Sequence, residues 1–224
     1  MVASLPKAIR QETDNLISRL VELGLADDQN HTILREKGND ICEVTFGNAA
    51  IVSIALRDIE YNEIYEKMVE ARSYNAKLLD GAVLQIMYEF KGRSLLRHRL
   101  AFFPSPQLVP FHDDPELYKE DTFFSEIIAR RIVPFPIRFD YDDREGIASE
   151  IIHPKSHLTL GQYEYCRIPV TSPLRPAWFV DFVIRNFYHT ASHSHADQIG
   201  QPFQCFSESI FSAERTIIHI AVPR

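Results

Sequence analysis

The chain has 224 residues, of which 45% are hydrophobic and 25% are charged, and its formal net charge at pH 7 is −7. These proportions are typical of a folded globular protein built as one large domain. The negative charge argues against a strong freestanding nucleic-acid binder, because that affinity comes largely from neutralised phosphates, although a local basic patch is compatible with it.

The cysteines and the apolar runs indicate the compartment. Cys42, Cys166 and Cys205 are odd in number and lack the paired spacing of a zinc site, so reduced thiols in a cytoplasmic protein are expected. No signal-peptide core is present, and no apolar run reaches the roughly 20 residues of a membrane helix. The sequence therefore predicts a cytoplasmic protein that does not enter a membrane. It leaves homo-oligomerisation open, and no motif identifies a cofactor.

The first part of the chain predicts a helix followed by short antiparallel strands. Apolar residues recur at helical spacing from Ile9 to Leu23, and Gly24 ends the pattern, so residues 1–26 are expected to contain an amphipathic helix. Strand-like runs follow at residues 32–36, 41–46 and 51–56, and a helical pattern occupies residues 61–73.

The clearest hairpin comes from residues 83–90 and 95–103, which turn at residues 91–93. On its second strand His98 lies with the apolar side chains, so a core histidine bonded to the backbone is expected. Arg97 and Arg99 lie on the opposite face. Farther along, Asp114 caps a predicted helix.

Residues 135–190 contain three strand-like runs, a His-Pro-Lys-Ser-His corner and an apolar helix. The runs are residues 137–141, 157–161 and 165–170, and the helix occupies residues 178–188. Residues 188–209 are polar and predicted to be a loop, and residues 216–222 are predicted to be a final strand. Together these patterns predict a single α+β domain with a curved, mainly antiparallel sheet packed by several helices.

Alternation in the three central runs places polar residues on one face, provided that the strands are neighbours. Those residues are Arg138, Asp140, His157, Thr159 and Arg167. Pro154 separates His153 from His157 and favours a turn, which argues against two zinc ligands on a helix.

The same residues suit acid–base chemistry on a phosphate. His153 and His157 would share the roles of general acid and base, Arg138 and Arg167 would hold the phosphate, and Asp140 would orient a neighbour. This set would suit metal-independent RNA cleavage. The alternative is that the same residues are structural or form an interface.

A second cluster contains His189, His193, His195 and Asp197, of which the last three are the candidate metal ligands. If this segment is extended, His193 and His195 share a face and could bind a divalent metal together with the aspartate. A solvated loop without a metal is the alternative.

The runs RFDYDDREG, HPKSHLTLG, CRIP and FVDFVIRNFY resemble a bacterial family catalogued as domain of unknown function 2290, mainly over residues 135–190. The resemblance implies a setting rather than a chemistry: an accessory or effector subunit encoded beside a helicase in anti-phage defence loci. The His/Arg/Asp set would make it a nuclease-like protein that acts on RNA or DNA. The alternative is a non-catalytic interaction or specificity module of the same complex. Its first helix or residues 178–188 would then form the interface.

Overall fold

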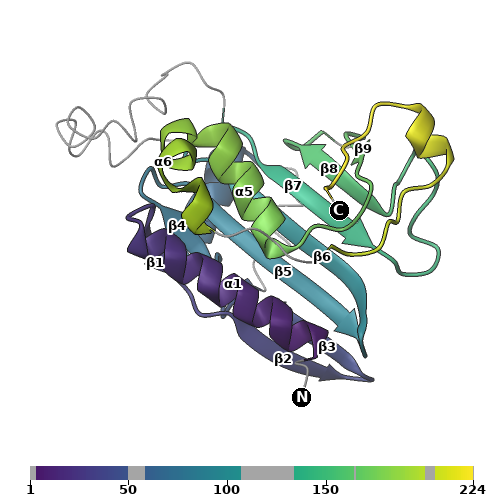
Figure 1. Ribbon diagram of the computed structural model, residues 1–224, viewed down its shortest axis with the longest axis horizontal. Coiled ribbons are helices and arrows are strands. Elements are labelled where there is room, and N and C mark those ends of the chain that lie inside the picture. The colour runs from purple at the N-terminus through teal and green to yellow at the C-terminus, as the bar shows by residue number, and fades with distance from the viewer. Residues whose placement is uncertain (1–3, 50–58, 107–133, 164, 200–204, 224) are drawn as a thin grey trace.

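The computed structural model describes residues 4–49, 59–106, 134–163, 165–199 and 205–223. The strand-like run predicted at residues 51–56 and the helix predicted after Asp114 lie outside these residues. The described residues form a nine-stranded sheet that is not closed, with helices packed on it (Figure 1). This arrangement confirms the predicted α+β class with a mainly antiparallel sheet. No helix in the described part of the chain is long and apolar enough to cross a membrane.

The strands run in the order β1-β4-β5-β6-β7-β8-β9, and the β2–β3 hairpin joins the sheet through β3 and β5. Every ladder between named strands is antiparallel. The strands are β1 Ala26–Gln29, β2 Ile33–Gly38, β3 Ile41–Thr45, β4 Ala76–Leu78, β5 Val83–Lys91, β6 Ser94–Phe103, β7 Ile137–Asp142, β8 Ser156–Leu160 and β9 Ile168–Pro169. The predicted central hairpin is thus confirmed as β5 and β6.

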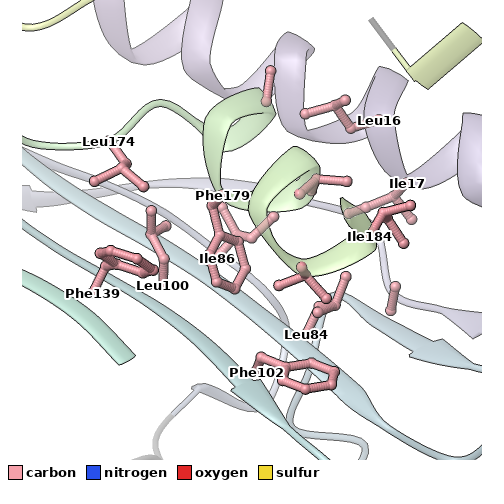
Figure 2. Close-up of a cluster of buried hydrophobic side chains, with 14 of the residues drawn as sticks. Leu16, Ile17, Leu84, Ile86, Leu100, Phe102, Phe139, Leu174, Phe179 and Ile184 are labelled. Carbon is pink, nitrogen blue, oxygen red and sulfur yellow. The ribbon is translucent and has the colours of Figure 1, made fainter. Parts of the chain in front are cut away.

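Helices α1 (Leu5–Glu22), α5 (Pro176–Phe187) and α6 (His189–Ile199) cover one face of the sheet. Figure 2 shows α5 lying on strand residues of this face, with Leu16 and Ile17 of α1 beside it. Phe179, Ile86 and Leu100 are completely buried there. Helix α2 (Tyr61–Glu70) packs on the other face, where Ile64 and Met68 join a smaller core.

Helix α1 also fixes the start of α5. The Glu12 carboxylate accepts hydrogen bonds from Arg175 Nε at 2.9 Å and from the Ala177 N–H at 3.1 Å, so it caps the first turn of α5. The apolar sides of both helices are buried in this packing. The domain itself therefore covers most of the apolar surface of the two helices, while Val21 and Phe187 remain exposed.

The prediction for His98 is confirmed. Its ring is buried among the apolar side chains, and the Leu174 N–H donates a hydrogen bond to Nε2 at 3.2 Å. Burial lowers the pKa of His98 to about 3, so the ring is neutral at pH 7.

Two predictions in the last third of the chain are wrong, and both concern segments that pair little with the sheet. Residues 189–199, predicted as loop, form α6, because Ala191 and Ile199 are buried against the core while the polar residues lie between them. The strand predicted at residues 216–222 starts instead in the 3₁₀ helix η2 (Ala213–Thr216), and only Ile220 bridges to Val170. Beyond Ile220, the Val222 N–H donates its hydrogen bond to the Thr171 hydroxyl and not to the backbone of a neighbouring strand.

Candidate functional site

The strands β6, β7 and β8 carry polar side chains on the face opposite α5, and we call this region the polar strand face. Its members are Arg99, Arg138, Asp140, His157 and Thr159. The ladders pair Asp140 with both Arg99 and His157, and pair Arg138 with Thr159. Paired residues of antiparallel strands point to the same side. The predicted adjacency of the three central strands is therefore confirmed, and so is the shared face of β7 and β8.

Asp140 occupies the centre of this face, and its main partner is Arg99. Arg99 Nε lies 2.8 Å from Asp140 Oδ1. Burial alone would raise the pKa of Asp140, but the guanidinium groups of Arg99 and Arg138 outweigh it and lower the pKa. The carboxylate is thus ionised and already paired.

Arg99 is the residue that sequence reasoning missed. Alternation placed it opposite His98, but nothing in the sequence showed that β6 is the neighbour of β7. One partial signal was available: two arginines on one face of a strand favour acidic partners on a neighbouring strand, although they do not show which strand that is.

Arg138 is nearly enclosed and incompletely paired. Its side chain is 14% exposed, its Nε lies 3.9 Å from Asp140 Oδ2, and that nitrogen has no hydrogen-bond partner. Burial and the nearby positive charges of Arg99 and Arg167 lower the pKa of Arg138, against the opposing effect of Asp140. A desolvated arginine without a full set of acceptors favours an anion nearby.

His157 is buried as well, with a side chain that is 5% exposed. Its Nδ1 lies 2.9 Å from the carbonyl oxygen of Pro154, so Nδ1 carries the proton and Nε2 is the unprotonated nitrogen. Burial lowers the pKa of His157, and Asp140 opposes that change without reversing it. The ring is therefore neutral at pH 7 and oriented by its own turn.

His153 and Arg167 lie at the border of the polar strand face. The rings of His153 and His157 are 5.2 Å apart between centroids, and His153 Nδ1 lies 2.8 Å from the carbonyl oxygen of Ile147. Arg167 precedes β9, which is shorter than the predicted strand at residues 165–170, because Pro169 has no N–H to continue the ladder. Within the described residues, no ion pair includes Arg167.

Ion pairing continues along the same side of the sheet beyond the candidate site. The Glu89 carboxylate on β5 lies 2.9 Å from Arg97 and 3.3 Å from Lys37. These pairs lower the pKa of Glu89 although burial opposes the change. This continuity supports a structural role for much of the charge on this side.

The second predicted cluster does not assemble. His193, His195 and Asp197 lie on α6, and residues two apart on a helix are rotated by about 200°, so the two histidines face different directions. A shared face was expected only if the segment is extended, and this condition is not met because the segment is helical. In the part of the chain that the structure describes, no group of three or more His, Cys, Asp or Glu side chains could hold a metal ion.

The fold and this face define a mixed α+β domain with an ion-paired strand face. A model of the family described as uncharacterized conserved protein (DUF2290) matches residues 25–222. The chain therefore belongs to this family, and the match extends well beyond the residues that carried the resemblance. The searches of curated proteins and of solved structures gave no match.

Proposed function

We propose that this protein is an accessory subunit of a bacterial anti-phage defence system, that it works with a helicase in the cytoplasm, and that it contributes binding rather than catalysis. The family resemblance supplies the setting, because members look like accessory proteins encoded beside a helicase. The choice of binding over catalysis rests on the chemistry of the polar strand face.

The observation that carries this choice is the enclosure of His157. A general base must come within hydrogen-bond reach of the proton that it removes. The His157 side chain is 5% exposed, and the neighbouring Asp140 carboxylate is already paired with Arg99. Both groups thus have partners within the chain, as expected for a polar interior that holds the strands together.

A second candidate function is contact with nucleic-acid phosphates at the same face, and a different observation favours it. Arg99, Arg138 and the bordering Arg167 outnumber Asp140 at the centre of the face, because Asp142, on the same side of β7, is paired with Arg144. Within the described residues Arg167 belongs to no ion pair. An excess of positive charge of this kind attracts phosphate. A nuclease-like activity would have to start from such a contact.

One set of assays separates these functions. The purified protein is mixed with the helicase that the proposal assigns to it as partner, and complex formation is measured by size-exclusion chromatography. Cleavage of labelled RNA and DNA is followed with EDTA, Mg²⁺ or Mn²⁺. We expect a stable complex and no cleavage by wild type, by His157→Ala or by the exposed-histidine control His31→Ala. Cleavage that is lost only in His157→Ala would replace the proposal with a nuclease. If no complex forms, the part of the proposal that makes the helicase a partner is wrong.

The phosphate contact has its own control. Arg167→Ala and Arg93→Ala each remove one arginine, but Arg93 is exposed in the turn between β5 and β6. If the polar strand face binds nucleic acid, only Arg167→Ala lowers the affinity for labelled single-stranded RNA and reduces the salt slope by about 0.7. Equal behaviour of the two variants would exclude this contact.

A further inference from the structure

The chain exposes isoleucines where two segments distant in sequence meet. One segment is the connection between β7 and β8, and the other follows η2 near the C-terminus; the two lie side by side at the right of Figure 1. The exposed residues are Ile147, Ile151, Ile152, Ile217 and Ile218, and we call this region the isoleucine surface. Ile152 is 73% exposed and Ile218 is 91% exposed. Single exposed apolar side chains are ordinary, but a group of them marks an interaction site.

Glu214 holds the two segments together. Its side chain is completely buried, and its carboxylate accepts hydrogen bonds from the Ile151 N–H at 3.2 Å and from the Phe211 N–H at 2.9 Å. The Ile217 N–H donates to the Glu214 carbonyl oxygen at 3.4 Å. Glu214 therefore joins the two segments in two ways: its side chain holds the backbone at Ile151, and its backbone carbonyl holds the backbone at Ile217.

The backbone at Ile151 is also unusual. Its φ is +66°, in the left-handed region that a β-branched residue rarely adopts. The bond from Ile151 to Glu214 and the bridge between Ser149 and His153 hold this conformation. Backbone strain of this kind is concentrated at functional positions.

Charge indicates what the surface fits. Glu145 and Glu150 are exposed in the same connection as Ile147, Ile151 and Ile152, and no ion pair within the described residues includes either glutamate. The charged neighbours Asp143 and Arg144 are instead paired with Lys155 and Asp142. An apolar group flanked by unpaired carboxylates complements an apolar site with a basic rim.

We propose that the isoleucine surface docks a partner protein whose apolar site is flanked by lysine or arginine side chains. The proposal rests on the proposed function, which makes this partner the helicase. The isoleucines enter the apolar site, and Glu145 and Glu150 face the basic rim. The strained turn at Ile151 keeps the connection in its binding shape before the partner arrives, so less entropy is lost on association.

The test measures affinity and association rate between the full chain and the helicase by biolayer interferometry. The variants are Ile152→Ser, Ile218→Ser and Glu150→Lys. Tyr163→Ser is the matched control, because Tyr163 is 76% exposed but lies beyond the other end of β8, about 16 Å along the strand. Circular dichroism and thermal unfolding establish that each variant is folded.

We expect each serine variant to weaken binding at least about tenfold, mainly through faster dissociation. Glu150→Lys should slow association and reduce its dependence on salt, and Tyr163→Ser should bind like wild type. If the helicase binds all variants equally, this docking surface is wrong while the proposed function stands.

Two other outcomes overturn the docking proposal in different ways. If the wild type does not bind the helicase, the proposed function fails and this inference fails with it. If the wild type self-associates in analytical ultracentrifugation and Ile218→Ser does not, the surface serves a second copy of the chain rather than a partner with a basic rim.

Discussion

The polar strand face and the isoleucine surface are opposite departures from the usual rule that charge is exposed and isoleucine is buried. On the polar strand face, Asp140 and His157 are enclosed, and each has a partner in the chain, Arg99 or the Pro154 carbonyl. On the isoleucine surface, Ile152 and Ile218 are exposed, and the described residues offer them no cover. Internal contacts therefore account for Asp140 and His157, but not for the isoleucine surface or for the buried Nε of Arg138, which has no hydrogen-bond partner.

This difference decides which region to interpret as functional. A buried polar group with good partners needs no external ligand to explain it. A group of exposed isoleucines on two segments that are joined by a buried side chain is better explained by a partner outside the chain. We therefore interpret Asp140 and His157 as residues that stabilise the sheet, and we propose the isoleucine surface as the region for recognition.

The largest expected effect comes from removing the carboxylate at the centre of the polar strand face. Asp140→Ala leaves Arg99 and Arg138 with uncompensated charge in a partly enclosed place, and we expect the free energy of unfolding to fall by about 3 kcal/mol. Urea unfolding measures this change. The control is Asp143→Ala, whose pair with Lys155 is more exposed and should contribute about 0–1 kcal/mol. If both variants lose the same free energy of unfolding, the enclosed carboxylate of Asp140 stabilises the fold no more than an exposed one does.

Lowering the pH tests the two buried histidines. Burial lowers the pKa of His98 from 6.5 to about 3 and lowers that of His157 as well. Below pH 6.5 the unfolded chain binds protons that the folded chain does not, so the free energy of unfolding falls as the pH falls.

For His98 alone the loss is about 2 kcal/mol between pH 7 and pH 5. Urea unfolding at these pH values measures it, and His98→Gln should show a shallower dependence than wild type. The depressed pKa of Asp140 adds a further loss at lower pH, since that carboxylate is protonated only there. A stability that stays constant from pH 7 to pH 5 would contradict the enclosure of both rings.

Glu214 is a completely buried acidic side chain whose hydrogen bonds hold the backbone of the isoleucine surface. Glu214→Ala removes the acceptor for the Ile151 and Phe211 N–H groups, and we expect a loss of about 1.5 kcal/mol together with faster proteolysis at residues 143–155. Glu150→Ala, in the same connection but exposed, serves as control. Unchanged proteolysis would mean that the connection keeps its shape without this carboxylate.

The smallest effect is expected on the isoleucine surface. Ile152→Ser should change the free energy of unfolding by less than about 0.5 kcal/mol, because its side chain is already in water. Ile86→Ala, in the completely buried core, should cost about 2–5 kcal/mol. Thermal unfolding compares the two. A large loss from Ile152→Ser would show that this isoleucine supports the fold instead of facing outward.

Much of the fold followed from local patterns. Helical spacing before Gly24 predicted α1, and alternation predicted the central hairpin and the polar side of β7. The sequence did not predict α6, because this helix is polar and has few buried residues, Ala191 and Ile199 among them. Its apolar residues therefore give only a weak helical periodicity. The final strand was predicted to be longer than it is, because apolar composition alone does not show whether a neighbouring strand is available for pairing.

For the candidate site, the sequence predicted which residues share a face but not how deeply they lie. Arg138, Asp140 and His157 were grouped correctly, whereas Arg99 was left out and the enclosure of His157 was not foreseen. Strand alternation depends only on backbone geometry, so it can be read locally. The exposure of a side chain depends on every segment that packs near it, so it cannot be predicted from the local sequence.

By itself the sequence determined the family, the α+β class, the antiparallel pairing of its clearest hairpin and the polar character of one strand face. These properties follow from periodicity, turn residues and side-chain polarity, which act over a few residues. Only the tertiary structure decided that Arg99 belongs beside Asp140, that His157 is enclosed, and that Glu214 brings Ile151 near Ile217. Those facts depend on strand order and on contacts between distant segments, which no local pattern encodes.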